Sequence, residues 1–315
     1  MKILVTGAAG AIGSHVAERL AESGHEVVGL DCLTDYYERS IKELNVEDLR
    51  QRGIEMLLHD LVDDPLDLAG AVDVIYHFAA QPGISATTPF ELFLRNNVVA
   101  THRLLEAARR NKKLKGFIHI STSSVYGARA DGAEATEPRP TSYYGVTKLA
   151  GEQLALAYHR EHGLPVVVLR LFSVYGPRER PEKLYHKLIR SILTDQPFTL
   201  HEGSERHIRS YSYIGDIVDG CILTLDRLAE VIGEIFNVGT DQPSTTGEGI
   251  KILETLLNQS AKIIIVPRRS GDQLETVANI NKARERLGYN PRTKLAEGLE
   301  AQIDWYKSLC RRRGY

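Results

Sequence analysis

The sequence predicts an α/β fold in which a doubly wound parallel sheet carries a smaller, interleaved C-terminal lobe. Two observations favour this fold: short apolar runs alternate with helical stretches through the first half of the chain, and a glycine-rich turn follows the first apolar run. The length of 315 residues suits one large domain or two interleaved ones.

The alternation can be followed element by element. Short apolar runs predict strands at residues 2–6, 26–31, 54–59, 72–78, 116–121, 166–171 and 236–238. The stretches between them predict helices at residues 11–23, 36–51, 90–111 and 144–162. Strands that alternate with helices in this way form a parallel sheet with helices on both faces.

Composition excludes several classes of protein. The chain is 43% hydrophobic and 25% charged, which is ordinary for a soluble enzyme. Its net charge of −2 gives no basic surface for nucleic acid, and no apolar run approaches the ~20 residues of a membrane span. The three cysteines, Cys32, Cys221 and Cys310, have no disulfide or metal spacing, and we expect no metal. We expect a cytoplasmic protein whose basic end, residues 311–313, is solvated.

A glycine-rich turn, Thr6-Gly-Ala-Ala-Gly-Ala-Ile-Gly13, joins the first strand to the first helix. Glycines permit a tight turn and the close approach of backbone to a pyrophosphate, and the helix N-terminus adds free N–H groups. The spacing G-x-x-G-x-x-G departs from the more common G-x-G-x-x-G, but its place between strand and helix predicts a Rossmann-like dinucleotide site. The residues that we expect to bind the dinucleotide here are Gly7, Gly10, Ala11, Ile12 and Gly13.

The second and third strands end in acidic residues. Asp31 closes the second strand, where a carboxylate can bind the ribose hydroxyls of adenosine and would repel a 2′-phosphate. No arginine lies in the glycine turn or directly after Asp31, so we expect NAD rather than NADP. Asp60 and Leu61, after the third strand, are candidates to hold the adenine edge.

Beyond Tyr175 the order of elements becomes irregular, and arginines, prolines and aromatics become denser between Arg178 and Tyr213. We expect residues 1–174 to form the NAD-binding domain, with returns to it near residues 214–240. Residues 175–315 should then form mainly the substrate-binding lobe.

Tyr144 and Lys148 lie four apart on a predicted helix and therefore share one face. An ammonium close to a phenol lowers the phenol pKa and makes it a better general base. Thr122, Ser123 and Ser124 end the strand just upstream, at the sheet edge where ligands of open parallel sheets bind. Each pattern alone is also common in solvated helices and turns.

With these motifs assembled, the chain resembles the extended short-chain dehydrogenase/reductase family, and more narrowly its nucleotide-sugar epimerases and dehydratases. The resemblance covers nearly the whole chain. It rests on the glycine turn, His77–Gln81, Asn97 with Thr101, Thr122–Gly127, Tyr144 with Lys148, Arg170–Pro177, Arg209–Asp216, Asn237–Gly239 and Arg269–Asp272.

The resemblance implies roles for these residues. Thr122 would hydrogen-bond the sugar hydroxyl, Tyr144 would remove its proton as hydride leaves C4 for NAD⁺, and Lys148 would lower the tyrosine pKa and bind the nicotinamide ribose. Further cofactor contacts are implied for Ala79, Ala80 and Asn97. Substrate contacts are implied for Gln81, Ser123, Ser124, Ser173, Arg180, Arg209 and Arg269, of which the last two would grip the nucleotide diphosphate.

The loop after Thr122 bears on the reaction. The family's 4,6-dehydratases carry Asp and Glu where this chain has Ser123 and Ser124, and its uronate decarboxylases usually carry a Glu in this loop. Without such acids, oxidation and return of hydride at C4 is favoured, which is epimerisation. A dehydratase or decarboxylase with acids from elsewhere, and a non-enzymatic NAD-binding sensor or scaffold, remain the alternatives.

The substrate follows from the same resemblance. Uronate 4-epimerases are similar to this chain in having a small hydroxyl residue at Ser173, which can donate to a C6 carboxylate, and Arg180 could add a matching charge. We expect UDP-glucuronate to be converted to UDP-galacturonate, with UDP-glucose or UDP-N-acetylglucosamine as alternative substrates. The resemblance also implies a homodimer through the helices at residues 90–111 and 144–162. Ala11 departs from the family's usual Phe, and no consequence follows from it.

Overall fold

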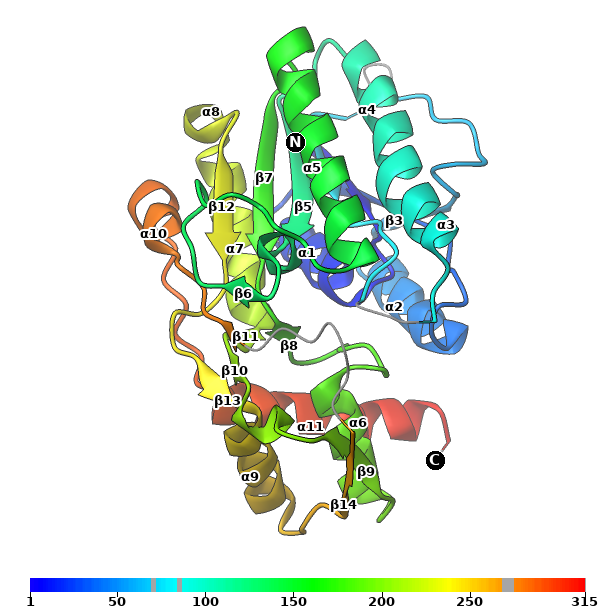
Figure 1. Ribbon diagram of the computed structural model, residues 1–315. Helices are drawn as coiled ribbons and strands as arrows, with labels where there is room; N and C mark the ends of the chain where they lie inside the picture. The colour runs from blue at the N-terminus through cyan, green and yellow to red at the C-terminus, as the bar shows by residue number, and fades with distance from the viewer. Residues whose placement is uncertain (69–71, 84–86, 268–274, 315) are drawn as a thin grey trace.

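The computed structural model describes residues 1–68, 72–83, 87–267 and 275–314. Its centre is a seven-stranded sheet in the order β12-β7-β5-β4-β1-β2-β3, with every pair of neighbours parallel (Figure 1). The strands are β1 (Lys2–Thr6), β2 (Glu26–Asp31), β3 (Glu55–Leu58), β4 (Val74–His77), β5 (Gly116–Thr122), β7 (Val166–Leu171) and β12 (Ile235–Val238). The chain order reverses between β1 and β4, and this switch point is where ligands of such sheets bind. The predicted doubly wound α/β fold is confirmed.

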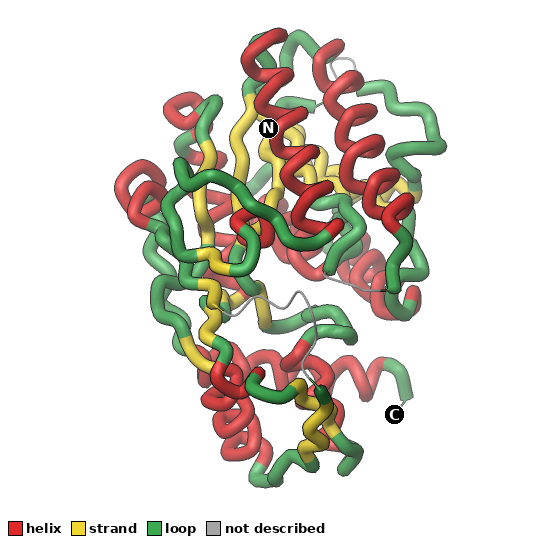
Figure 2. Tube along the Cα trace, in the orientation of Figure 1, coloured by secondary structure: helices red, strands yellow, loops and turns green. Residues whose placement is uncertain are grey.

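Helices cover both faces of the sheet (Figure 2). One face packs against α4 (Ala100–Arg110) and α5 (Tyr143–His162), and the other against α1 (Ala11–Glu22), α2 (Arg39–Gln51) and α7 (Ile214–Asp226). Successive strand residues point to opposite faces, so Leu4 joins the first layer while Ile3 and Val5 join the second. Strands buried on both faces have to be apolar throughout, which explains the continuous runs seen in the sequence.

The predicted helix over residues 90–111 is wrong as a single α-helix. The structure divides it into α3 (Phe90–Phe93), the π-helical turn η1 (Leu94–Val99) and α4. A π-turn holds an extra residue, which hydrophobic periodicity does not show, and such turns are frequent at functional sites.

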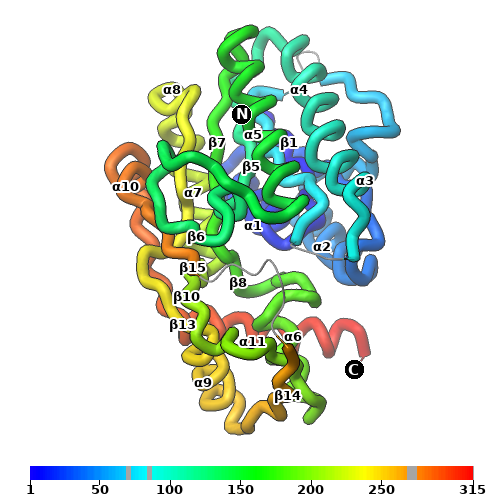
Figure 3. The backbone as a smooth tube through the Cα atoms, viewed as in Figure 1, coloured from blue at the N-terminus to red at the C-terminus, as the bar shows by residue number. Residues whose placement is uncertain are grey.

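Residues that lie mostly after β7 build a second cluster of elements, drawn below the sheet in Figure 3. Its core joins helices α6, α9 and α11 to the parallel pair of strands β9 and β14. Short strands β8 and β11 pair with each other, and β13, β10, β15 and β6 form a small mixed sheet. The bounds are α6 (Leu184–Leu193), α9 (Thr246–Leu257), α11 (Leu295–Arg312), β9 (Phe198–His201), β14 (Ile263–Val266), β8 (Val174–Tyr175), β11 (Ser212–Tyr213), β13 (Ser244–Thr245), β10 (Ile208–Arg209), β15 (Glu275–Thr276) and β6 (Arg129–Ala130). The short helices α8 (Leu228–Val231) and α10 (Asn281–Leu287) lie beside the main sheet, and 3₁₀ turns occupy Ser123–Tyr126 and Ser204–Arg206.

Strand β14 is unusual in its exposure. Ile263, Ile264 and Ile265 are 38%, 50% and 57% exposed, and β9 is the one strand among the described residues that pairs with β14. The predicted boundary near residue 174 between a cofactor domain and a substrate lobe stays a prediction.

The basic end of the chain is bound to the first half of the molecule. Arg312 Nη2 lies 2.9 Å from Asp48 Oδ1 of α2, and Arg313 pairs with Glu38, the residue before α2. The expectation of a solvated end holds for Arg311 and Arg312, which are exposed, but the side chain of Arg313 is only 16% exposed, because α11 runs back across the molecule and carries its last arginines to acidic residues that lie far away in sequence.

Arg178 makes a second link to the same acidic surface. Its Nη2 lies 2.8 Å from Glu18 Oε1 of α1 and 3.2 Å from Asp48 Oδ2. Its backbone has φ of +63°, a left-handed conformation that is costly for a residue with a side chain. We call Arg178 and Arg312, with Glu18 and Asp48, the charged seam.

Candidate active site

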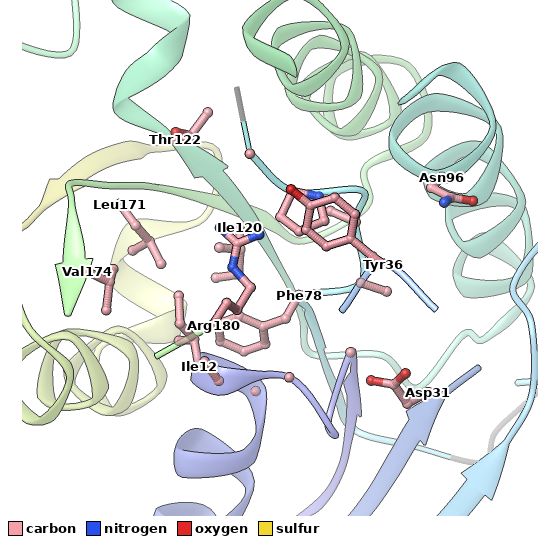
Figure 4. A pocket seen from close by; sticks show the side chains of 18 of the residues that line it. Ile12, Asp31, Tyr36, Phe78, Asn96, Ile120, Thr122, Leu171, Val174 and Arg180 are labelled. Atoms are coloured by element: carbon pink, nitrogen blue, oxygen red, sulfur yellow. The ribbon is translucent and has the colours of Figure 1, made fainter. Parts of the chain in front are cut away.

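A cavity of about 430 Å³ lies beyond the carboxyl ends of the central strands. Figure 4 shows Asp31 at one side of it, Thr122 at another, and the side chains of Arg180 and Tyr36 between them. The predicted site residues that line it are Gly7, Gly10, Ala11, Ile12, Gly13, Asp31, Asp60, Leu61, Ala79, Ala80, Thr122, Ser123, Ser124, Tyr144, Lys148, Ser173 and Arg180. Residues predicted from separate motifs therefore meet in one cavity.

Four predicted residues are not placed in that cavity. Asn97 and Gln81 are almost fully buried beside it, and Arg209 lies on β10 outside its lining. Arg269 lies outside the described residues. Asn97 Oδ1 accepts the Gln81 N–H at 2.7 Å, while its Nδ2 donates to Thr147 Oγ1 at 3.0 Å. In this structure Asn97 ties the loop after β4 to α5, so its predicted contact with the cofactor would need a different arrangement.

The glycine turn is a close-packed cradle. Gly7 has φ of +69°, and a Cβ there would lie 2.7 Å from the Ala79 nitrogen. A Cβ on Gly13 would lie 2.3 Å from the Gly7 carbonyl oxygen. Neither position can hold a side chain without movement of backbone, and Gly10 stands directly before the first residue of α1. The cradle fits a dinucleotide pyrophosphate on the free amides of the helix N-terminus.

Asp31 is fixed by backbone amides at the end of β2. Oδ2 accepts from Ala9 N at 3.0 Å and Oδ1 from Leu33 N at 2.9 Å. Burial raises the pKa of Asp31, although these amides and the charge of Lys42 oppose that rise. Lys42, which the sequence analysis missed, also lines the cavity and donates to Thr34.

Asp60 is fixed by an arginine that the sequence analysis also missed. Arg95, on the π-helical turn, lies 3.1 Å from Asp60 Oδ2, and Val62 N donates to Asp60 Oδ1 at 2.7 Å. Burial alone would raise the pKa of Asp60, but these hydrogen bonds outweigh it and lower the pKa. The π-helix thus connects the loop near Asp60 to the loop held by Asn97.

The Tyr144 phenol is enclosed at the start of α5, opposite Thr122 at the end of β5. Burial raises the pKa of Tyr144, while a hydrogen bond with Thr122 and the charge of Arg180 lower it. We expected the lysine to have the main influence on this phenol. The positive charge that lowers the pKa of Tyr144 in the structure is that of Arg180, which comes from the second half of the chain.

Lys148 is buried below Tyr144 on the same face of α5, where its Nζ donates to the Ile120 carbonyl oxygen. Burial lowers the pKa of Lys148 to about 8, although the negative charge of Glu152 opposes this shift. An ammonium without a directly paired carboxylate can act on a neighbouring phenolate or ribose.

Glu152 is not free to pair with Lys148, because its carboxylate already forms an ion pair with Arg170. Arg170 Nε donates to Glu152 Oε2 at 3.0 Å and Arg170 Nη2 binds Oε1, while Ser121 Oγ donates to Oε2 at 2.7 Å. The side chains of Arg170 and Glu152 are 2% and 0% exposed. A further donor bond from Arg170 Nη1 to the Tyr126 hydroxyl, at 2.8 Å, completes the network. This network was not predicted, since it joins residues from four separate elements.

The turn after Thr122 carries hydroxyls and no carboxylate. Thr122 Oγ1 accepts from Ser124 N at 3.2 Å and donates to Ser124 Oγ at 3.3 Å. Among the described residues that line the cavity, the acids are Asp31, Asp60 and Glu179. Glu179 is held by His186 N and by Gln302 Nε2, so it is not aimed at Tyr144.

Two general features complete the description. Within the described ranges, no group of three or more His, Cys, Asp or Glu side chains could hold a metal ion. In the same part of the chain, no helix is long and apolar enough to cross a membrane.

The chain is similar to known proteins over nearly its whole length. An uncharacterized UDP-glucose epimerase of Bacillus subtilis is 38% identical, covering 98% of this chain and 99% of that one. UDP-glucuronate 4-epimerase 1 of Arabidopsis thaliana is 36% identical, and the match covers 98% of this chain and 77% of that one. The structure of UDP-glucuronic acid 4-epimerase from Bacillus cereus, with UDP-glucuronic acid and NAD, is 40% identical, has a TM-score of 0.93 and covers 98% and 100%. The model of the NAD dependent epimerase/dehydratase family matches residues 3–239, so the chain belongs to that family and uses NAD as its cofactor.

Proposed function

We propose that the protein is an NAD-dependent UDP-glucuronate 4-epimerase, which forms UDP-galacturonate through a 4-keto intermediate. The observation that carries the proposal is the turn of Thr122, Ser123 and Ser124 beside Tyr144, with hydroxyls where a lyase would need an acid. Bound NAD supplies the acceptor and donor of hydride. The relatives from Arabidopsis thaliana and Bacillus cereus, which are 4-epimerases of this uronate, support the proposal.

Tyr144 is the proposed base. As the phenolate, it accepts the proton of the C4 hydroxyl, while Thr122, whose influence lowers the pKa of the phenol, holds the same hydroxyl. Since burial favours the neutral phenol, the positive charges around it have to stabilise the phenolate before it accepts the substrate proton. The same phenolic oxygen then returns the proton after the 4-keto sugar has turned its other face to the cofactor. Lys148 contributes charge and holds the nicotinamide ribose, while the Arg170–Glu152 pair keeps its ammonium available.

The remaining residues are assigned to the C6 carboxylate, the adenine dinucleotide and the diphosphate. Ser123, Ser124, Ser173 and Arg180 are proposed to surround the C6 carboxylate, because hydroxyl donors and a guanidinium suit a carboxylate. The glycine turn, Asp31, Asp60 and Leu61 would hold the adenine dinucleotide. Arg209 and Arg269 would bind the diphosphate once substrate is present.

Product identification tests the proposal directly. The NAD-loaded protein is incubated with UDP-glucuronate, and the sugar products are resolved by NMR. Appearance of UDP-galacturonate without net NADH supports it. Much faster turnover of UDP-glucose or UDP-N-acetylglucosamine would overturn the choice of substrate.

A second candidate is UDP-glucose 4-epimerisation, which the Bacillus subtilis relative favours by its name. The same panel separates the two substrates. A stable 4-keto product would instead indicate a dehydratase, and release of CO₂ a decarboxylase. NAD binding without turnover of any nucleotide sugar would point to a sensor or scaffold.

We also propose a cytoplasmic homodimer. Apolar side chains stand exposed on α3, η1 and α5, where a second copy could cover them: Phe90, Leu92, Leu94, Val99, Tyr143 and Val146. Sedimentation velocity of the wild type against Val146→Asp tests the dimer, because a buried charge at the interface would shift the protein toward monomer. Cell fractionation tests the location.

A further inference from the structure

A second cation, Lys183, lines the cavity near Arg180 and has no role in the sequence motifs. It stands directly before α6, and 31% of its side chain is exposed. A lysine in such a cavity is either neutralised by the protein or available to an anion of the ligand. The partners of its ammonium decide between these cases.

The positive charge of Lys183 is only weakly compensated by other groups of the protein. Its Nζ donates to the Val174 carbonyl oxygen, one residue beyond Ser173, while Glu179 Oε1 is 3.7 Å away. The other carboxylate oxygen of Glu179 accepts from His186 N at 2.9 Å and Gln302 Nε2 at 2.7 Å, which fixes the acid in place. Among the described residues, the Lys183 ammonium thus has a carbonyl oxygen and a carboxylate oxygen at 3.7 Å as its partners, which leaves a donor for a ligand.

The Arg180 guanidinium has closer charged and aromatic partners within the protein than the Lys183 ammonium has. Its Nη1 lies 2.8 Å from Glu182 Oε1, and its guanidinium lies over the ring of Tyr36 at 5.8 Å. Figure 4 shows Arg180 reaching across the cavity, with Val174, whose carbonyl binds Lys183, on another side of it. The hydrogen bond to the Val174 carbonyl oxygen places the Lys183 ammonium beside the residue that follows Ser173.

Burial favours an anionic ligand at this position. The low-dielectric surroundings lower the pKa of Lys183, and the charge of Arg180 lowers it further, although Glu179 opposes both. An anion placed beside the ammonium would compensate that desolvation. UDP-glucuronate carries one anionic group more than UDP-glucose, at C6, which is the group proposed to lie near Ser173.

We propose that the Lys183 ammonium binds the C6 carboxylate of the nucleotide sugar and thereby selects uronates over neutral sugars. The proposal rests on the function proposed above. It assigns to Lys183 a share of the specificity that Ser173 and Arg180 alone would otherwise supply.

The test compares Lys183→Met and Lys183→Arg with the wild type, all loaded with NAD. Calorimetry measures binding of UDP-glucuronate, UDP-glucose and UDP, and kcat/KM is measured for the two sugars. Because a hydrogen bond to a charged group is lost, Lys183→Met should weaken UDP-glucuronate binding by about 10- to 100-fold. UDP-glucose and UDP should change by less than about 3-fold, and Lys183→Arg should recover part of the loss. Lys187→Met, an exposed lysine one turn further along α6, is the matched control and should change nothing.

Two results would overturn the proposal. Equal losses for all three ligands would place the ammonium on the diphosphate, and unchanged binding of UDP-glucuronate would exclude any contact. Thermal melting shows whether each variant is folded. If the wild type epimerises UDP-glucuronate but Lys183→Met leaves the binding of UDP-glucuronate unchanged, this inference alone fails. If the wild type does not accept UDP-glucuronate, the proposed function fails.

Discussion

The two walls of the cavity differ in how their charges are held. On the wall formed by β5 and α5, Lys148 is backed by Arg170 and Glu152, whose side chains are 2% and 0% exposed. On the wall formed by the segment before α6, Arg180 and Glu182 form a pair that is 19% and 35% exposed. On the first wall, several short hydrogen bonds fix Arg170 and Glu152, whereas the partly exposed ion pair of the second wall can exchange its partners for a ligand.

This difference matches the tasks proposed for the walls. Proton transfer needs a donor and an acceptor in one geometry, which a sheet and a buried network maintain. Recognition of a charged sugar that must turn over during the reaction needs cations that can change partners. Rigid positioning and the exchange of ionic partners are therefore divided between neighbouring parts of one cavity.

Loss of the base should have the largest effect. Tyr144→Phe removes the proton acceptor and should reduce kcat by about 10²- to 10⁴-fold or more, with NAD still bound. Tyr143→Phe makes the same change one residue earlier, on an exposed side chain, and should leave kcat near the wild-type value. Single-turnover kinetics and the NAD content of the purified protein measure both. Unchanged turnover in Tyr144→Phe would refute the assigned base.

Breaking the buried network should have the next largest effect. Arg170→Met leaves the Glu152 carboxylate buried without its partner, which should cost about 3–5 kcal/mol of the free energy of unfolding. Arg139→Met, in a pair with Glu137 whose side chains are 78% and 73% exposed, should change it by less than about 0.5 kcal/mol. Chemical denaturation measures both changes. Adding Glu152→Leu to Arg170→Met should recover part of the loss, and equal costs for the buried and exposed arginines would contradict the comparison.

The pH dependence should report Lys148. Burial lowers the pKa of Lys148 to about 8, so the ammonium is present below that pH and is lost as the pH rises through it. Activity should therefore fall on the alkaline side with a midpoint near pH 8. In Lys148→Arg, the remaining activity should keep its alkaline limb to higher pH, because a guanidinium stays charged. An alkaline limb that does not move would assign it to another group.

The charged seam should have the smallest effect. Asp48→Asn removes the acid that Arg178 and Arg312 share, which should cost about 1 kcal/mol at low salt and less at high salt. The thermal midpoint at two salt concentrations measures it, with Asp63→Asn, an exposed partner of Arg95, as a control. Loss of the salt dependence of UDP-glucuronate binding in the same variant would show that the seam also supports the second wall.

The sequence predicted those features of the fold that the local pattern of residues determines. The bounds of β1, β2 and β7 agree with the runs expected from apolar periodicity, and the residues at their carboxyl ends meet in one cavity. It did not predict the π-helical turn, which inserts one residue without altering the polar pattern. Nor did it predict Arg95 beside Asp60 or Arg170 beside Glu152, because such pairs depend on which distant elements the fold brings together.

The elements outside the main sheet were harder to predict for the same reason. Short strands such as β8 and β10 have two residues each, which is too few for a periodic signal. Lys183 carries no motif of its own, and only the position of α6 brings it beside Val174 and Glu179.

The exposed edge of β14 has a practical consequence for work with this protein. Three adjacent, exposed isoleucines lie on this strand, which has one neighbour among the described strands. Such an apolar edge can pair with strands of other molecules. Concentrated preparations should therefore self-associate through this edge when the neighbouring elements loosen on warming. Ile264→Lys places a charge in the middle of the strand, and it should raise the concentration at which light scattering begins without altering the cavity.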